Sequence, residues 1–521
     1  MFLNTIVKIL FWSLFMKKKN TLLTGTLILT FAGLITRIMG FFYKIFLSNT
    51  LTAEHLGLYQ LVFPVYGICF TLYGSGIQTA ISQLVANCSA DLKASAKQKR
   101  VLKTGLLLSV SIALSLSVLL FWMGDVIAEK FLMERRCASS LRVLAFVFPF
   151  CGMTACINGY YYGLKKTGVP ATTQLLEQIV RIASVYILSV MLGNGNQKVT
   201  CELAVLGIVL GEIASDIFSI FALLLDRKRK TKQKAIHFHP IKRLLSLTLP
   251  LTGNRLVVSL LHSYEAVLIP YMLQIYGMSS KKALSVYGIL TGMSMPFIMF
   301  PSTITNSVAV LLLPAVSEAQ ASNNMTQIKK TSEVSMKYSL LIGLYASCIF
   351  LLFGDTLGTV FFHNPTSGNY MTILSWLCPF LYLSTMLGSI INGLGEAHMT
   401  LFNTVISLGV RIFFLCWLVP KQGLKGYMIG LLVSQLIITI LDFYTIRKHV
   451  PITIDSINWI LKPSLILLCL GFLSLKLYEY FKALIPIPSG LFLILLCIAL
   501  GTIYLCFLLL TNVITTNDLQ A

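Results

Sequence analysis

Long apolar runs separated by short polar segments follow one another along nearly the whole chain. A helix needs about 20 predominantly apolar residues to cross the hydrocarbon core of a bilayer. About 14 runs reach this length, approximately 22–46, 57–86, 104–124, 141–162, 171–193, 201–225, 243–275, 284–314, 337–361, 371–394, 400–419, 425–446, 460–481 and 490–512. Because unpaired backbone groups are costly in lipid, the pattern predicts an all-α, polytopic membrane protein with about 14 transmembrane helices.

Two of these runs are longer than a simple span and contain prolines. The seventh run holds Pro250 and Pro270, and the eighth holds Pro296 and Pro301. Proline removes a backbone donor and clashes with the preceding turn. We therefore expect kinked or broken helices at these two places.

A pattern of residues occurs twice, 230 positions apart. The matching segments are Pro149-Phe150, Gly163-Leu164 and Val180-Arg181-Ile182 in the first copy, and Pro379-Phe380, Gly393-Leu394 and Val410-Arg411-Ile412 in the second. The helix that follows each copy carries a stripe of small residues that lets helices approach closely. The stripes are Gly207, Gly211 and Ser215, and Gly426, Gly430 and Ser434. The repeat predicts two six-helix lobes in a pseudo-twofold arrangement, followed by two extra helices.

This reading divides the chain into five parts. They are an N-terminal extension (1–16), an N-lobe of helices 1–6 (17–225), a basic cytoplasmic linker (226–242), a C-lobe of helices 7–12 (243–446) and two C-terminal helices (447–521). The first fifteen residues are apolar but too short to span, and Met16 before three lysines would make a natural start. We expect the extension to lie outside the native protein, with an interfacial helix as the alternative.

The charge balance agrees with a membrane protein. Only 12% of residues are charged, although Lys and Arg number 41 against 19 Asp and Glu, and soluble proteins carry about 25% charged residues. The basic residues lie between apolar runs, where the positive-inside rule accounts for them, so we exclude nucleic-acid binding. Their distribution predicts a multi-pass protein of the cell membrane with both termini cytoplasmic. The basic linker could also attract anionic lipid headgroups.

Five cations lie inside or at the end of apolar runs: Arg37, Lys44, Arg181, Arg255 and Arg411. A lipid-embedded arginine costs about 2.5–3.5 kcal/mol on insertion scales, so it usually faces a bundle interior or a wet cavity. Arginine also suits phosphate oxygens. We predict that the five bind an anionic substrate, although Lys44 could instead extend to the interface.

Four acidic residues could carry ion or proton coupling: Glu177, Glu212, Asp216 and Glu265. Each also has a structural alternative. Glu177 lies one turn before Arg181 and could neutralise it, Glu265 could serve Arg255, and Glu212 and Asp216 could pair with an arginine of a neighbouring helix. The sequence leaves both interpretations open.

Motifs for catalysis, cofactors and metals are missing from the sequence. There is no phosphate-binding loop, no catalytic serine or zinc motif, and the 12 cysteines lie mostly scattered in apolar runs without ligand spacing. We therefore expect no catalytic residue, no cofactor and no metal site. Transport would draw on an ion gradient, the membrane potential or the substrate gradient.

Several segments together resemble a known family. They are residues 25–41, which include Thr-Arg-Ile-Met-Gly-Phe at 36–41, and residues 57–60, 80–86, 159–164, 177–181, 300–307 and 313–319. The set resembles the stage V sporulation protein B branch of polysaccharide biosynthesis proteins, in the multidrug/oligosaccharidyl-lipid/polysaccharide (MOP) exporter superfamily. The resemblance implies two six-helix lobes around a V-shaped cavity, as in multidrug exporters, and alternating access.

The resemblance also implies a substrate, an undecaprenyl-diphosphate-linked saccharide that is a peptidoglycan precursor for the spore cortex. Arg37 matches the first-helix arginine that lipid II flippases of the superfamily use. Their eighth-helix arginine is absent from residues 287–301, and the first-helix aspartate of many drug exporters is absent as well. We predict a flippase, with membrane lipids and cell-wall synthesis enzymes as further partners. The alternatives are a cation-coupled multidrug exporter, a membrane-embedded glycosyltransferase and a non-transporting scaffold.

Overall fold

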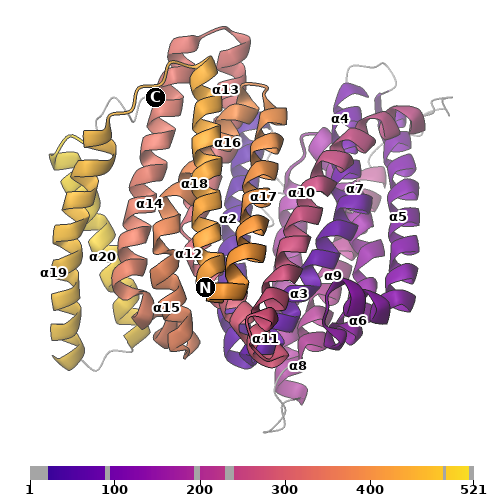
Figure 1. The fold of residues 1–521 in the computed structure, drawn as a ribbon. Helices are drawn as coiled ribbons and strands as arrows, with labels where there is room; N and C mark the ends of the chain where they lie inside the picture. The colour runs from indigo at the N-terminus through magenta and orange to yellow at the C-terminus, as the bar shows by residue number, and fades with distance from the viewer. Residues whose placement is uncertain (1–20, 89–93, 193–199, 229–239, 485–488, 515–521) are drawn as a thin grey trace. The chain divides into compact units, whose positions relative to one another are not determined.

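The computed structural model describes residues 21–88, 94–192, 200–228, 240–484 and 489–514. Within these residues the chain is almost entirely helical and contains no strand (Figure 1). The N-terminal extension 1–16 and most of the basic linker 226–242 lie outside the described residues.

The first part of the chain forms helices that follow the predicted runs. They are α2 (Thr21–Thr50), α3 (Ala53–Phe70), η1 (Thr71–Ser75), α4 (Gly76–Asn87), α5 (Ala94–Val126), η3 (Ile127–Phe131), η4 (Arg135–Cys137), α6 (Ala138–Ala145), α7 (Val147–Gly163), α8 (Gly168–Leu192) and α9 (Cys201–Lys228). The segment η1 is one turn of π-helix that joins α3 to α4 without a break. Such turns often lie at functional sites.

The second part of the chain repeats this order. Its helices are α10 (Ile241–Ile275), α11 (Ser280–Gly288), η5 (Ile289–Ser294), α12 (Met295–Met299), α13 (Ser302–Ala321), α14 (Met325–Phe362), α15 (Pro365–Leu374), η6 (Ser375–Leu377), α16 (Cys378–Gly393), α17 (Ala397–Gln422) and α18 (Leu424–His449), followed by η7 (Ile457–Leu461), α19 (Lys462–Leu484) and α20 (Ser489–Leu510).

The number of spanning helices agrees with the prediction. Among the described residues, 12 helices are long and apolar enough to cross a membrane, and two bent pairs raise this number to 14. One pair, Ser280–Met299 and Ser302–Ala321, bends by 59° beside Pro301, so the predicted break in the eighth run is confirmed. The helix α10 passes through Pro250 and Pro270 without interruption. The all-α, polytopic fold class is confirmed.

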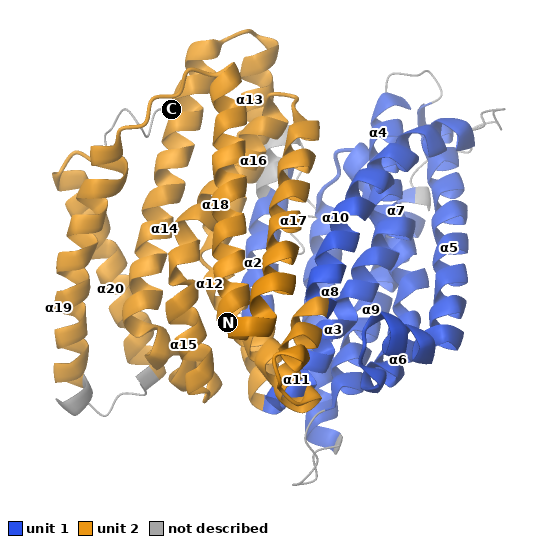
Figure 2. Ribbon diagram, in the orientation of Figure 1, with its two compact units in different colours: residues 1–43, 50–267 blue, residues 44–49, 268–521 orange. Residues whose placement is uncertain are grey.

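The chain forms two compact units (Figure 2). Unit 1 comprises residues 1–43 and 50–267, and unit 2 comprises 44–49 and 268–521. We predicted that the second lobe begins at residue 243, whereas unit 1 includes α10 as far as Val267. The end of α2, Lys44–Asn49, belongs to unit 2, where Asn49 Nδ2 donates to the Phe361 carbonyl at 3.0 Å. Both α2 and α10 therefore contribute residues to both units.

The repeat in the sequence is also a repeat in hydrogen bonding. In unit 1, Ser117 Oγ donates to the Ala145 carbonyl at 2.5 Å. In unit 2, Ser347 Oγ donates to the Ser375 carbonyl at 2.6 Å. Both members of this second pair lie 230 positions after those of the first. The two units are thus built on the same pattern.

Close helix packing at a glycine also occurs in both units. A Cβ placed on Gly163 would lie 2.7 Å from Val85 Cβ, and one placed on Gly393 would lie 2.8 Å from Val316 Cβ. Backbones can approach this closely in a membrane only where residues are small. The glycines therefore fix the packing of α7 on α4 in unit 1 and of α16 on α13 in unit 2.

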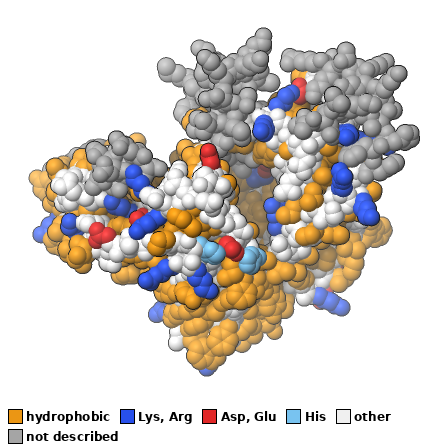
Figure 3. Space-filling view, turned by 90° about the horizontal axis from the view of Figure 1, so that it is seen from above, with side chains coloured by type: hydrophobic (Ala, Val, Ile, Leu, Met, Phe, Trp, Pro, Cys, Tyr) orange, Lys and Arg blue, Asp and Glu red, His pale blue; other side chains and the backbone are white. Residues whose placement is uncertain are grey.

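The two C-terminal helices pack on α14 within unit 2 (Figure 1). The Tyr345 hydroxyl of α14 donates to the Cys497 carbonyl at 2.6 Å, and its ring stacks on that of Tyr504. Large apolar side chains are exposed along both helices, and hydrophobic side chains cover much of the molecular surface in Figure 3. Contiguous apolar surface of this extent is typical of contact with lipid.

Candidate functional site

The predicted arginine of the fifth run lies in α8 of unit 1 and is paired. Arg181 Nη2 donates to Glu177 Oε1 one turn earlier, and the two side chains are 17% and 22% exposed. Gly211 of α9 faces this pair, since a Cβ there would lie 2.8 Å from the Glu177 carbonyl and 3.3 Å from Arg181 Cβ. The predicted stripe of small residues thus brings α9 against the ion pair.

Two further acids lie near the same arginine. Glu212 and Asp216 of α9 are 5% and 2% exposed, and Glu212 lies within electrostatic range of Arg181 and Glu177. Thr154 Oγ1 of α7 donates to Asp216 Oδ1 at 3.5 Å. The structure therefore gathers Arg181 and three acids, Glu177, Glu212 and Asp216, into one cluster. An excess of acid in a buried place suits a cation or a proton.

The equivalent place in unit 2 has a different chemistry. Arg411 Nε of α17 donates to Ser434 Oγ of α18 at 2.9 Å, and Ser407 Oγ donates to the Ser434 carbonyl at 2.9 Å. Ser407 occupies the place of Glu177, one turn before the arginine. A hydroxyl thus accepts a hydrogen bond from the second arginine, whereas a carboxylate accepts one from the first.

Unit 2 contains a buried acid that the sequence analysis missed. Asp442 of α18 is 2% exposed and accepts a hydrogen bond from Asn403 Nδ2 of α17 at 2.8 Å. Asn403 Nδ2 also donates to Thr445 Oγ1 at 3.3 Å. An aspartate inside the twelfth run was the available signal, because ionisable residues within a membrane helix are functional candidates by default.

The cations of α2 are exposed. Arg37 and Lys44 have no side-chain hydrogen bond or ion pair within the described part of the chain, whereas Tyr43 on the same helix is 5% exposed. The sequence of α2 contains no acidic residue, and the described neighbours of Arg37 supply no acidic partner either. An unneutralised guanidinium on an apolar helix is suited to an anionic ligand.

Arg255 of α10 binds backbone and hydroxyl groups of unit 1. Arg255 Nη1 donates to the Ser75 carbonyl at 2.6 Å, and Nη2 donates to Thr79 Oγ1 at 3.2 Å. Glu265, which the sequence offered as a possible partner of Arg255, is 5% exposed, and its carboxylate lies 3.6 Å from His262 Nδ1. Two of the five guanidinium N–H groups are used, and the side chain is exposed.

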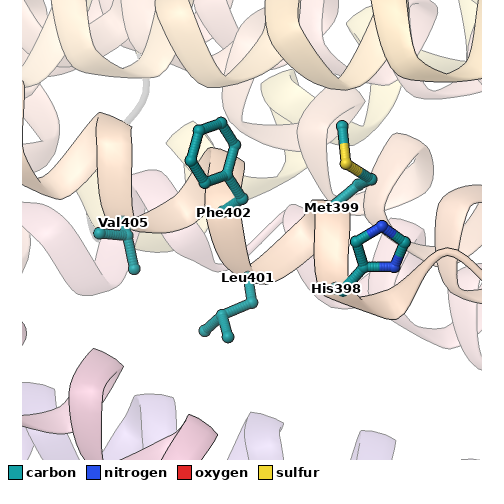
Figure 4. Close-up of a pocket in the computed structure, with 5 residues that line it drawn as sticks. All are labelled: His398, Met399, Leu401, Phe402 and Val405. Carbon is teal, nitrogen blue, oxygen red and sulfur yellow. The ribbon is translucent and has the colours of Figure 1, made fainter.

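A pocket of about 480 Å³ opens beside the first turns of α17 (Figure 4). Its lining residues are His398, Met399, Leu401, Phe402 and Val405. These side chains are apolar except for His398, and none of the predicted cations or acids is among them. The described residues also contain no cluster of three or more His, Cys, Asp or Glu that could hold a metal ion.

Comparison with known proteins agrees with this architecture. The sequence profile of polysaccharide biosynthesis proteins matches residues 22–320, and that of MatE matches residues 257–418. Stage V sporulation protein B of Bacillus subtilis is 28% identical over 474 residues, which cover 89% of this chain and 90% of the relative. The lipid II flippase MurJ of Bacillus subtilis is 22% identical over 471 residues, which cover 82% of this chain and 83% of the relative.

Solved structures share the fold. A lipid II flippase MurJ in an inward closed conformation has a TM-score of 0.69 and 14% identity, with 92% of this chain and 98% of that chain covered. An inward-facing multidrug resistance MATE transporter of the MOP superfamily has a TM-score of 0.64 and 16% identity, with 79% and 94% covered. The predicted resemblance is confirmed: this chain belongs to the family of polysaccharide biosynthesis proteins, and it shares its fold with a lipid II flippase and with a transporter of the MOP superfamily.

Proposed function

We propose that the protein is a flippase that moves an undecaprenyl-diphosphate-linked saccharide, a peptidoglycan precursor for the spore cortex, across the cell membrane by alternating access. The proposal rests on the exposure of Arg37 and Arg255 and on the groups that lie around them. Both are exposed on apolar helices, and neither forms an ion pair with an acid among the residues that the structure describes. The relatives named for a lipid-linked substrate, such as lipid II flippase MurJ, support it.

In this proposal the diphosphate meets guanidinium groups while the polyprenyl tail stays in lipid. Arg37 and Arg255 provide the first contacts, and Arg411 and Lys44 contribute further positive charge, whereas Arg181 is held by Glu177. Planar guanidinium groups can bind phosphate oxygens through two parallel hydrogen bonds. With both termini in the cytoplasm, the substrate leaves on the outer face, where cell-wall synthesis enzymes receive it.

The energy for transport can come from two sources. Moving negative charge outward across an inside-negative membrane is favoured by about 2.3 kcal/mol per charge per 100 mV. The cluster of Glu177, Glu212 and Asp216 beside Arg181, together with the buried Glu265, supplies candidate sites for a coupling proton or cation. Dependence of transport on an imposed ion gradient would distinguish coupling from transport driven by the potential.

The test is transport of fluorescent lipid II in proteoliposomes. We expect Arg37→Ala and Arg255→Ala to lower the rate at least tenfold, because each removes a contact to the diphosphate. Arg243→Ala is the matched control, since Arg243 is an exposed arginine at the N-terminal end of the same helix as Arg255. Variants at Arg37 and Arg255 that insert normally and transport at the wild-type rate would reject the assigned roles.

One observation favours a second candidate, a cation-coupled exporter of organic cations. The cluster around Arg181 has three acids against one arginine, and the MatE profile matches part of the chain. For this function Glu212 and Asp216 would bind the coupling ion. Efflux of a fluorescent cation driven by a proton gradient, lost in Glu212→Gln, would favour the exporter over the flippase.

A further inference from the structure

One face of α10 carries a row of polar side chains that contacts the π-helical part of the second span. Thr252, Arg255, Ser259 and Ser263 follow at intervals of three or four residues, so they lie on the same face of the helix. We call this row the α10 seam. The seam packs against the continuous stretch from α3 through η1 to α4, which also belongs to unit 1.

The contacts run along the whole seam. Ser263 Oγ donates to the Pro64 carbonyl at 3.1 Å. A Cβ on Gly67 would lie 3.6 Å from Ser259 Oγ, and one on Gly76 would lie 2.0 Å from Thr252 Oγ1. Outside the seam, Leu244 and Leu247 at the start of α10 pack in the apolar core of unit 1. The seam and this apolar end therefore both hold α10 in unit 1.

Arg255 closes a small ring of hydrogen bonds at η1. Its Nη1 donates to the Ser75 carbonyl at 2.6 Å and its Nη2 to Thr79 Oγ1 at 3.2 Å, while Thr79 Oγ1 itself donates to the Ser75 carbonyl at 3.1 Å. Hydrogen bonds to a charged group are worth about 1.5–3 kcal/mol. The ring joins α10 to the last residue of the π-helical turn and the first turn of α4.

Three hydroxyl groups of η1 and α10 have no hydrogen-bond partner among the described residues. They are Ser75 Oγ, Thr252 Oγ1 and, one turn earlier on α10, Thr248 Oγ1. Thr252 lies against Gly76, next to the Ser75 carbonyl that Arg255 binds. Buried polar groups usually bond to protein or to ordered water. The hydroxyl groups of Ser75 and Thr252 can therefore form new hydrogen bonds if the seam shifts.

We propose that the α10 seam is a releasable clamp on η1, opened by the anionic headgroup of the substrate. When a diphosphate binds Arg255, the guanidinium leaves the Ser75 carbonyl and Thr79, and the hydroxyls of Thr252 and Ser75 gain hydrogen bonds in the shifted seam. The helix α10 can then move relative to α3–α4. This inference rests on the proposed function, and it assigns to Arg255 the task of coupling substrate binding to that movement.

A disulfide across the seam can lock the clamp reversibly and so test it. In the double variant Gly76→Cys with Thr252→Cys, the two Cβ atoms would lie about 3.2 Å apart, and disulfides form at Cβ separations of about 3.5–4.5 Å, so a small shift suffices. Lipid II transport in proteoliposomes and binding of inorganic diphosphate are measured with the cysteines reduced and then oxidised. The single variants and the wild type, which has 12 cysteines, receive the same oxidant as controls.

We expect the reduced double variant to transport lipid II. Oxidation should lower transport at least tenfold, leave diphosphate binding within threefold, and be reversed by reductant. Equal transport in the oxidised and reduced states overturns the clamp and leaves the flippase proposal standing. A wild-type protein that neither binds diphosphate nor moves lipid II overturns both.

Hydrogen exchange supplies an independent measurement on unlocked protein. Inorganic diphosphate should increase deuterium uptake in residues 71–79 of the wild type, and Thr79→Val should increase it without ligand, because either change breaks the ring. The matched control is Thr291→Val, which removes a hydroxyl that bonds only within its own helix segment, to the Tyr287 carbonyl at 2.7 Å. Unchanged uptake with diphosphate bound overturns the clamp.

Discussion

The helix pair α8–α9 of unit 1 and the pair α17–α18 of unit 2 hold equivalent arginines in different ways. Arg411 Nε donates to Ser434 Oγ at 2.9 Å. At the matching atoms of unit 1, Arg181 Nε and Ser215 Oγ both lack a partner among the described residues, and the guanidinium is turned to Glu177 instead. One carboxylate in place of Ser407 is thus enough to redirect the arginine.

The difference shows that two copies of one helix pair can give equivalent arginines different surroundings. In unit 2 the arginine donates to a neutral hydroxyl, Ser434 Oγ, on the neighbouring helix. In unit 1 the arginine is surrounded by Glu177, Glu212 and Asp216, which suits a cation or a proton. The common backbone of the two units thus holds an arginine among acids in unit 1 and an arginine that donates to a hydroxyl in unit 2.

The largest expected effect comes from removing each arginine in turn. Arg181→Ala leaves three acids clustered without their cation, and breaking a buried pair in this way costs about 3 kcal/mol of unfolding free energy. Arg411→Ala removes a hydrogen bond to a hydroxyl, which costs about 1.5 kcal/mol. The midpoint of thermal unfolding in detergent should therefore fall further for Arg181→Ala than for Arg411→Ala.

A double variant provides the control for that comparison. Arg181→Ala with Glu177→Ala should be more stable than Arg181→Ala alone, because it removes one of the uncompensated acids. Glu177→Ala alone should be the mildest of the three, since it frees Arg181 to bind Ser215 as Arg411 binds Ser434. Equal unfolding midpoints for Arg181→Ala and Arg411→Ala would show that the acids do not distinguish the two units.

A single substitution should make the surroundings of Arg411 resemble those of Arg181. Ser407→Glu places a carboxylate one turn before Arg411, where an i,i+4 pair forms readily. If Arg411 binds the diphosphate during transport, the competing carboxylate should lower transport of lipid II about tenfold, which corresponds to about 1.4 kcal/mol. The control is Ser407→Gln, which has the same size without the charge. Equal transport in the two variants would remove Arg411 from the substrate path.

The surroundings of the two arginines show which features could be predicted from the sequence. Hydrophobic run length predicted the helices, and the spacing of Glu177 and Arg181 gave their pairing as one of two interpretations, because both features depend on neighbours within one helix. The partners of Arg255 could not be predicted, because Ser75 and Thr79 lie on a distant helix whose π-helical turn leaves no sequence signature. The same holds for Asp442, whose partner Asn403 belongs to another helix.

The packing of each pair gives a smaller effect that should be alike in the two units. A Cβ on Gly211 would lie 2.8 Å from the Glu177 carbonyl, and one on Gly430 would lie 2.5 Å from Phe414 Cβ. Gly211→Ala and Gly430→Ala should each cost about 1–3 kcal/mol by overpacking, measured as a loss of thermal stability. Gly409→Ala is the control, because nothing lies within 4 Å of its added Cβ. A loss in only one unit would mean that the two helix pairs do not pack equivalently.

We expect the smallest effect from removing a hydrogen bond that repeats in both units at a distance from the arginines. Ser117→Ala and Ser347→Ala each remove one hydrogen bond to a carbonyl of a neighbouring helical segment, and each should cost about 1 kcal/mol. Because the two bonds have the same register, the two losses in unfolding midpoint should agree. Ser111→Ala is the matched control, since its hydroxyl bonds only to the Leu108 carbonyl of its own helix at 2.9 Å and should have a smaller effect. A loss at Ser117 no greater than that at Ser111 would mean that these interhelical bonds do not stabilise the units, and the common scaffold would then depend on glycine packing alone.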